Sequence, residues 1–168
     1  MISVPIVAGL VVFVPMLIEA AIAGSNARTL RAQGAIEPTG DVFGAMQFAY
    51  PAAFLVMIVE GDLRQVQPDR LVVAGMVVFA LAKALKYWAI ATLGTRWTFR
   101  VLVPPGSTRI RRGPYRWLAH PNYIAVALEL TGTLLALHAF VTGPIAVAGF
   151  SLLMWQRVRI EETALSAE

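Results

Sequence analysis

The sequence predicts an all-α integral membrane protein with about five transmembrane helices, and three observations favour this class. Hydrophobic residues make up 58% of the 168 residues and charged residues only 14%, whereas about a quarter of the residues in a soluble domain are charged. The apolar residues form runs long enough to cross a bilayer. Most basic residues lie between those runs, as at the cytoplasmic border of membrane proteins. We therefore expect one membrane domain over residues 1–168 and, despite a net charge of +4, no nucleic-acid partner.

The first three apolar runs are each long enough for an independent span. Residues 4–23 form the first, and because no basic residue precedes them they lack the start of a cleaved signal peptide. We expect residues 24–41 to form a polar loop. Residues 42–59 form the second span, in which Tyr50-Pro51 predicts a kink, and residues 71–93 form the third.

The last two apolar stretches, residues 122–137 and 144–155, are each short for an independent span. We expect them to form a tight C-terminal helical hairpin, or a re-entrant segment, that returns the chain to the side it left. Within the single predicted domain, residues 1–70 contain the N-terminal spans and residues 71–165 contain the polar motifs. His138 lies in the turn of the hairpin, and we expect it to be structural because a histidine at a membrane border needs no ligand.

The distribution of arginine predicts the orientation in the membrane. The segment 94–119 contains six arginines and no acidic residue. With five spans, it lies on the same side as residues 24–41 and as the C-terminus, which carry four more arginines, whereas the opposite side has two. The positive-inside rule then predicts an inner (cytoplasmic) membrane protein with its N-terminus outside and its C-terminus and polar motifs in the cytoplasm. The arginines counted on the cytoplasmic side are Arg28, Arg31, Arg96, Arg100, Arg109, Arg111, Arg112, Arg116, Arg157 and Arg159.

His120-Pro121 has the pattern of a helix start, because proline is favoured at the first helical position. The unpaired N–H groups of that first turn, with the positive end of the helix dipole, form a site for a carboxylate or phosphate. Tyr115, Asn122 and Tyr123 add hydrogen-bonding and stacking groups. The alternative is a capped membrane helix with an interfacial aromatic belt and lipid-facing arginines.

The C-terminal helix carries a second polar motif. Arg157 and Glu161 are four residues apart, and Arg159 and Glu162 are three apart, so each pair shares a helix face. These pairs are either ordinary surface ion pairs or part of a site. The hairpin favours a site, because it returns this segment to the side where the helix after His120 begins.

Glu129 lies about two turns into the fourth predicted helix, at a depth where a carboxylate needs a partner or a polar cavity. Lys83 or Lys86, three apart on one face of the third span, is the natural partner. A structural ion pair is one interpretation of Glu129. The other is a polar group at the base of an acceptor pocket.

The composition also limits the chemistry. The chain has no cysteine, which excludes disulfides, thiolate metal sites and cysteine nucleophiles. Two histidines are too few for a His-rich metal site, so we expect no metal. The sequence leaves the oligomeric state open, although Ala74 and Gly75 offer a small-residue packing face on the third span.

Together the two motifs resemble those of the isoprenylcysteine carboxyl methyltransferase family, which is grouped with other membrane methyltransferases including phospholipid N-methyltransferases. The resemblance covers roughly residues 75–165. An upstream segment is similar to the small bacterial branch associated with O-methylation of alkylpyrone-type polyketide lipids. The residues that carry the resemblance are Gly113-Pro114-Tyr115-Arg116, His120-Pro121-Asn122-Tyr123, Arg157 and Glu161-Glu162, with Tyr87-Trp88 and Leu93-Gly94-Thr95-Arg96-Trp97-Thr98 upstream.

The resemblance implies that S-adenosylmethionine binds at the cytoplasmic border and that Arg157 faces the acceptor. Glu129 is the other candidate catalytic residue, should a hydroxyl acceptor need a base. The family usually has an arginine where this chain has Ala119, and Arg116 is the candidate to replace it. The implied cofactor-binding residues are Thr108, Arg109, Ile110, Tyr115, His120, Pro121, Asn122, Tyr123, Glu161 and Glu162.

The function implied is an S-adenosylmethionine-dependent methyltransferase acting on the oxygen of a hydrophobic or lipid acceptor, such as a prenylated-cysteine carboxylate or an alkylpyrone. Methyl transfer from a sulfonium needs alignment and desolvation rather than a metal or a covalent nucleophile. The alternatives are a phospholipid N-methyltransferase, an NADPH-dependent membrane reductase and a non-enzymatic lipid-binding or scaffold protein.

Overall fold

The structure, a computed structural model, describes residues 3–37, 40, 42–106, 108 and 110–166, and for residues 161–166 it describes the backbone alone. The described residues form five α-helices and two short 3-10 helices, without strands apart from one isolated bridge between Ile36 and Val103. The predicted all-α class is therefore confirmed. In chain order the elements are α1 (Val4–Ala32), α2 (Phe43–Leu63), α3 (Arg70–Leu93), η1 (Gly94–Arg96), η2 (Gly113–Arg116), α4 (Pro121–Ala136) and α5 (Thr142–Ser166).

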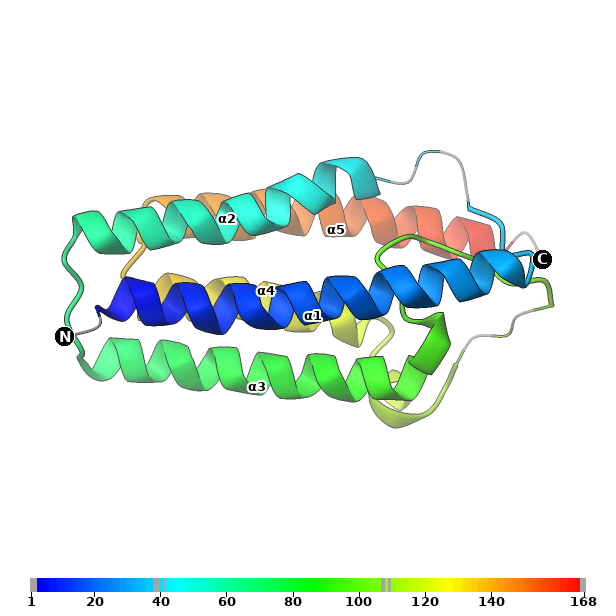
Figure 1. The fold of residues 1–168 in the computed structure, drawn as a ribbon, viewed down its shortest axis with the longest axis horizontal. Helices are drawn as coiled ribbons and strands as arrows, with labels where there is room; N and C mark the ends of the chain where they lie inside the picture. The colour runs from blue at the N-terminus through cyan, green and yellow to red at the C-terminus, as the bar shows by residue number, and fades with distance from the viewer. Residues whose placement is uncertain (1–2, 38–39, 41, 107, 109, 167–168) are drawn as a thin grey trace.

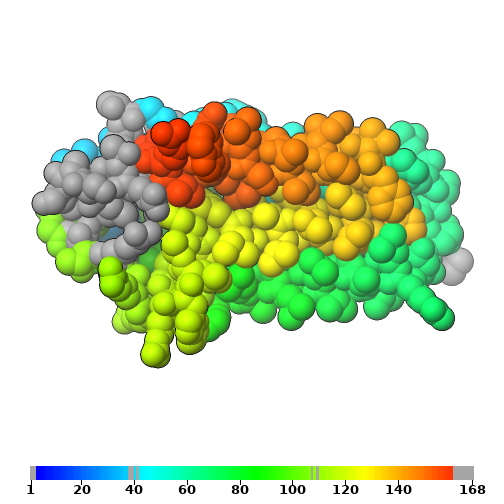
Figure 2. All heavy atoms as spheres, turned by 180° about the vertical axis from the view of Figure 1, so that it is seen from behind, coloured from blue at the N-terminus to red at the C-terminus, as the bar shows by residue number. Residues whose placement is uncertain are grey.

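The five helices run side by side along the long axis of the molecule (Figure 1). α4 packs against α3 and α5, and α2 packs against α1 and α5. From behind, α5, α4 and α3 form three adjoining bands along the length of the bundle (Figure 2). The predicted C-terminal hairpin is thus present, and α5 closes the bundle against α2.

Three helices are long and apolar enough to cross a membrane: α1, α2 and the helix that begins at Arg70 and continues through η1 to Arg96. Their outer faces carry large apolar side chains such as Leu17 (71% exposed), Phe48 (71%) and Leu81 (64%). A soluble protein rarely exposes so much contiguous apolar surface, whereas lipid accommodates it at no cost. The chain is a membrane protein.

The first helix differs from the prediction, since α1 continues through Ala32 instead of ending near Ala23. Its polar composition past Gly24 suggested a loop. However, Ala27 is only 9% exposed and Leu30 2%, so burial of one face stabilises the extra turns as helix. α2 continues through Pro51 to Leu63.

Small residues bring α3 and α4 into close contact. A Cβ on Gly75 would lie 2.3 Å from the Ala136 nitrogen, and one on Gly132 would lie 2.7 Å from the Phe79 nitrogen. Close approach through glycines is a common way for membrane helices to pack. Gly75 therefore serves packing within the chain rather than between chains, and Ala74 lies on the exposed side of α3.

The bundle has two distinct ends (Figure 1). The α1–α2 connection, the segment between α3 and α4, and the C-terminal part of α5 meet at one end. The α2–α3 connection and the α4–α5 turn, which contains His138, lie at the other. The structure thus brings the arginine-rich segments to one end, as predicted. We call it the arginine-rich end.

Candidate functional site

A hollow at the arginine-rich end gathers most of the predicted site residues. It lies between the segment that joins α3 to α4, the start of α4, and α5. We call it the motif hollow. The residues of the predicted site that line it are Thr108, Ile110, Tyr115, His120, Asn122, Tyr123 and Arg157, together with Ala119.

His120 is the N-cap of α4 and Pro121 its first residue, as the sequence predicted. The His120 carbonyl accepts hydrogen bonds from the N–H groups of Tyr123 (3.1 Å) and Ile124 (3.3 Å). The His120 and Tyr123 rings stack with centroids 5.5 Å apart and planes 21° from parallel. Pro121 is fully buried and fixes the helix start. The wall of the hollow at this point is therefore a stacked pair of rings at a helix N-terminus.

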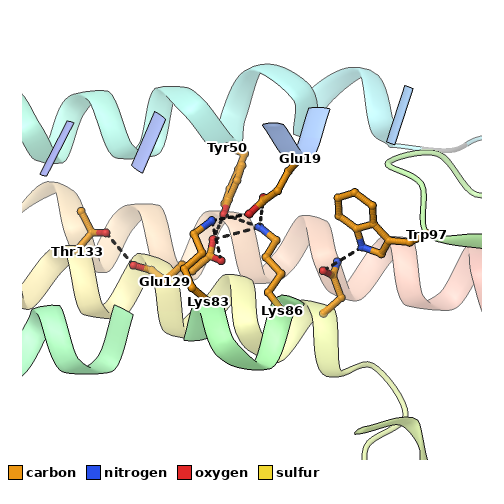
Figure 3. A network of polar contacts seen from close by, with 8 residues as sticks. Glu19, Tyr50, Lys83, Lys86, Trp97, Glu129 and Thr133 are labelled. Carbon is orange, nitrogen blue, oxygen red and sulfur yellow. Dashed lines mark hydrogen bonds and ion pairs between the residues drawn. The ribbon is translucent and has the colours of Figure 1, made fainter. Parts of the chain in front are cut away.

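The extra turns of α1 fix the segment that follows α3. Asn26 donates hydrogen bonds from Nδ2 to the carbonyls of Gly94 (3.2 Å) and Trp97 (2.8 Å). Trp97 is 2% exposed, and its indole Nε1 donates to Asn122 Oδ1 at 3.4 Å (Figure 3). α1 and α4 thus hold the Trp97 side of the motif hollow from two directions. Asn26 and Trp97 were not among the predicted site residues, although Trp97 lies in the upstream motif.

The turn that carries Tyr115 is held against the end of α3. Gly113 has φ +55°, and a Cβ there would lie 2.3 Å from Thr92 Oγ1. Both facts require glycine at this position. Gly113 begins η2, whose second residue, Pro114, is buried, so Tyr115 reaches the hollow from a turn that is held in place.

Arg157 enters the motif hollow from α5. It is 6% exposed, and its Nη1 contacts Met46 Sδ on α2 at 3.8 Å. The guanidinium is therefore largely shielded from solvent. Arg159 is exposed and lies over the Trp155 ring at 4.9 Å. The side chains of Glu161 and Glu162, and all of Arg109, lie outside the described part of the structure, so the predicted pairs of Arg157 and Arg159 remain predictions.

Arg116, the candidate to replace the missing arginine at Ala119, lies over the Trp117 ring at 5.8 Å. It does not line the motif hollow, whereas Arg96 and Arg100 do. Arg96 Nη1 donates to the Thr108 carbonyl at 2.8 Å. Arg96 and Ala119 line the same hollow, so Arg96 is a better candidate than Arg116 for the missing arginine.

Glu37 joins the two connections at the arginine-rich end. Its carboxylate pairs with Arg31 at 2.8 Å and Arg100 at 2.6 Å, next to the bridge between Ile36 and Val103. Burial raises the pKa of Glu37, but hydrogen bonds from Arg100 and Arg31 outweigh burial, so its pKa lies below the usual value of 4.5. The pair with Arg100 therefore persists at neutral pH.

A second polar cluster lies in the middle of the bundle, and we call it the ion network (Figure 3). Lys83 Nζ lies 2.7 Å from Glu19 and 3.2 Å from Glu129. Lys86 Nζ lies at the same two distances from these carboxylates. The Tyr50 hydroxyl donates to Glu129 and accepts from Lys86 at 3.3 Å. The ion network thus joins α1, α2, α3 and α4.

The predicted partner of Glu129 was Lys83 or Lys86, and the structure pairs it with both. Glu19 and Tyr50 were missed. A lone carboxylate in the apolar run of the first span was the available signal for Glu19, since such a group needs a partner. Glu129 does not line the motif hollow, and six residues separate it from Tyr123, which is roughly 9 Å along a helix. Its catalytic role therefore stays a prediction.

The fold and the hollow define a small helical membrane protein with a basic site at one end of its bundle. The chain belongs to the isoprenylcysteine carboxyl methyltransferase (ICMT) family, which it matches over residues 73–167. That range contains the second half of the bundle and every described residue that lines the motif hollow.

Two relatives extend the similarity to the N-terminal helices. The chain is 34% identical over 152 residues to the uncharacterized protein YpbQ of Bacillus subtilis (strain 168), a match that covers 88% of each chain. It is 24% identical over 140 residues to an uncharacterized protein of Haemophilus influenzae, with 83% of this chain and 81% of the relative covered.

Proposed function

We propose that this protein is an S-adenosylmethionine-dependent methyltransferase that O-methylates a hydrophobic acceptor, such as a prenylated-cysteine carboxylate or an alkylpyrone-type lipid. The observation that carries the proposal is the motif hollow, in which residues from the two distant motifs lie together. Membership in a family of methyltransferases supports the reaction type.

The chemistry of the hollow suits S-adenosylmethionine, which when bound supplies an electrophilic methyl group on a sulfonium. The Asn122 N–H, at the positive end of the α4 dipole, and the Arg96 guanidinium offer hydrogen bonds and positive charge to a carboxylate. The rings of Tyr115 and Tyr123 offer aromatic faces to a cation. The other cofactor-binding residues that we propose are Thr108, Arg109, Ile110, His120, Pro121, Asn122, Glu161 and Glu162.

Arg157 is our candidate for the acceptor side. Its guanidinium is largely buried and reaches the hollow from α5, where it can pair with an anionic oxygen. A carboxylate or enolate acceptor arrives ionised and needs no general base. Glu129 is held by two lysines and a tyrosine hydroxyl, so we propose that it supports the floor beneath the acceptor and does not take a proton.

We further propose that the arginine-rich end faces the cytoplasm, with the start of α1 outside. The asymmetry of arginine between the two ends supports this orientation. A site at this border is accessible to a polar cofactor from the aqueous side and to a hydrophobic acceptor by lateral diffusion from the bilayer.

The central test is incubation of the purified protein with methyl-labelled S-adenosylmethionine and extracted membrane lipids, followed by identification of the labelled product. Label in a methyl ester or enol ether supports the proposal. Label on a headgroup amine would instead identify a phospholipid N-methyltransferase. Absence of label with both cofactor and lipid present would contradict a methyltransferase of lipids.

A second test uses matched histidine variants. His120→Asn keeps a good N-cap residue but removes the imidazole from the motif hollow, so we expect at least about tenfold weaker cofactor binding, or 1.4 kcal/mol, by calorimetry. His138→Asn is the control at the opposite end, where asparagine tolerates the positive φ of 50°. Equal affinities for the two variants and the wild type would contradict the proposed site.

A further inference from the structure

A second hollow lies beside the motif hollow, at the end of α3. Three arginines line it, Arg96, Arg111 and Arg112, together with Thr95 and Thr108. Arg111 and Arg112 line this hollow and not the motif hollow. We call it the arginine hollow.

None of the described residues that line the arginine hollow is acidic, so its three guanidinium groups have no carboxylate among them. Arg96 donates to the Thr108 carbonyl at 2.8 Å and Arg112 donates from Nη2 to the Thr92 carbonyl at 3.3 Å. These bonds orient the side chains but leave their charge uncompensated, because the acceptors are neutral.

Three other arginines of the described structure have carboxylate partners. Arg31 and Arg100 share Glu37, and Arg64 pairs with Glu60 at 2.8 Å. No ion pair of that kind is recorded among the described side chains for Arg96, Arg111 or Arg112. The arginine hollow therefore concentrates positive charge that an anion from outside the chain can neutralise.

Two exposed tryptophans place this hollow at the height of the lipid headgroups. Trp88 is 47% exposed and Trp117 68%, and their rings lie 5.9 Å apart. Thr92 links them to the hollow: its hydroxyl donates to the Trp88 carbonyl at 2.8 Å, and its own carbonyl accepts from Arg112. Tryptophan gathers at the membrane–water interface, so the arginines beside this pair face the headgroup layer.

We propose that the arginine hollow binds the headgroup phosphate of an anionic phospholipid from the surrounding membrane. Guanidinium matches phosphate in shape and charge and binds it through paired hydrogen bonds. Basic clusters next to membrane spans attract anionic lipids in the same way. A zwitterionic lipid is disfavoured because its own cation would face three guanidinium groups. This site is distinct from the proposed cofactor site, although Arg96 and Thr108 border both.

The test is native mass spectrometry of the detergent-purified full chain titrated with phosphatidylglycerol, phosphatidylcholine or inorganic phosphate. We expect phosphatidylglycerol to bind tightest. At about one kcal/mol for each arginine, Arg111→Gln combined with Arg112→Gln should weaken its binding about 10–30-fold. Arg111→Gln alone, which breaks no hydrogen bond recorded in the described structure, should weaken it about fivefold.

The matched control is Arg28→Gln combined with Arg159→Gln, which removes the same charge from exposed positions at the same end. We expect its phosphatidylglycerol binding to stay within about twofold of the wild type. An equal loss in both double variants would overturn the proposal in favour of a diffuse charge effect. Phosphatidylcholine or inorganic phosphate binding as tightly as phosphatidylglycerol would also overturn it.

Cofactor affinity measured on the same variants separates this proposal from the proposed function. Arg111 and Arg112 lie outside the motif hollow, so their double variant should bind S-adenosylmethionine within about twofold of the wild type while losing the lipid. Loss of cofactor binding with full retention of phosphatidylglycerol would overturn the lipid site and leave the methyltransferase proposal intact.

Discussion

The ion network and the arginine-rich end differ in how their charges are paired. The charged groups of the ion network are paired with one another, whereas most arginines at the arginine-rich end have no carboxylate partner among the described side chains. In the network, each of two ammonium groups lies 2.7–3.2 Å from both of two carboxylates. At the end, Glu37 pairs with two of the many arginines. Charge in the membrane interior is costly unless it is paired, whereas at the border water and headgroups screen it. Unpaired cations there are available to ligands.

Removal of one carboxylate from the ion network should have the largest effect on stability. Glu129→Gln leaves Lys83 and Lys86 with only Glu19, and an uncompensated buried charge costs about 3–5 kcal/mol. Unfolding in mixed detergent and denaturant would measure the change. Glu37→Gln at the border is the control, and an equal loss in both would mean that depth does not govern the cost of charge in this protein.

A charge-balanced double variant tests whether the stability of the ion network depends on its net charge. Glu129→Gln combined with Lys86→Met leaves Glu19 and Lys83 as a neutral pair at 2.7 Å. We expect the double variant to be more stable than the sum of the two single losses by about 1–3 kcal/mol. Additive losses, measured in the same unfolding assay, would show that the network acts through individual contacts rather than through neutrality.

Asn26→Ala tests how the arginine-rich end is held. It removes the donor shared by the carbonyls of Gly94 and Trp97, and we expect a loss of about 1–2 kcal/mol. Because Arg96 and Trp97 line the motif hollow, cofactor binding should weaken as well. Calorimetry and thermal unfolding would separate the two effects. Unchanged cofactor affinity would show that the α1 contact does not position the hollow.

Glu37→Gln should have the smallest effect, about 1 kcal/mol or less, because its carboxylate and both arginines are partly exposed. The pKa of Glu37 is lowered in the folded state, so its contribution is present above the unfolded value of 4.5 and disappears as the pH falls through the folded value. The difference in Tm between wild type and variant should be constant near neutral pH and should shrink below pH 4.5. A difference that grows below that pH would contradict this pairing.

The sequence predicted the motif hollow better than the ion network. His120-Pro121 and Arg157 have local patterns, and a helical hairpin was enough to bring them to one end. Partners across helices depend on the rotation of each helix about its axis, which composition does not fix. Glu129 was therefore predicted to meet a lysine of α3, but Glu19 of α1 and Tyr50 of α2 were missed. The extra turns of α1 were missed because their polar residues resemble a loop until the burial of Leu30 is known.

The extra turns also make α1 longer than the hydrocarbon layer of a bilayer is thick. The 29 residues of α1 span roughly 43 Å at 1.5 Å per residue, against a hydrocarbon thickness of about 30 Å. Even at a tilt of about 20°, α1 extends roughly 40 Å along the membrane normal. About 10 Å of the helix therefore lies outside the hydrocarbon core. The arginines of α1, Arg28 and Arg31, are in its last turns, and charged residues favour the membrane border. The C-terminal end of α1 is therefore the part expected to protrude, and through Asn26 the depth of α1 in the bilayer sets the height of the hollow above the lipid tails.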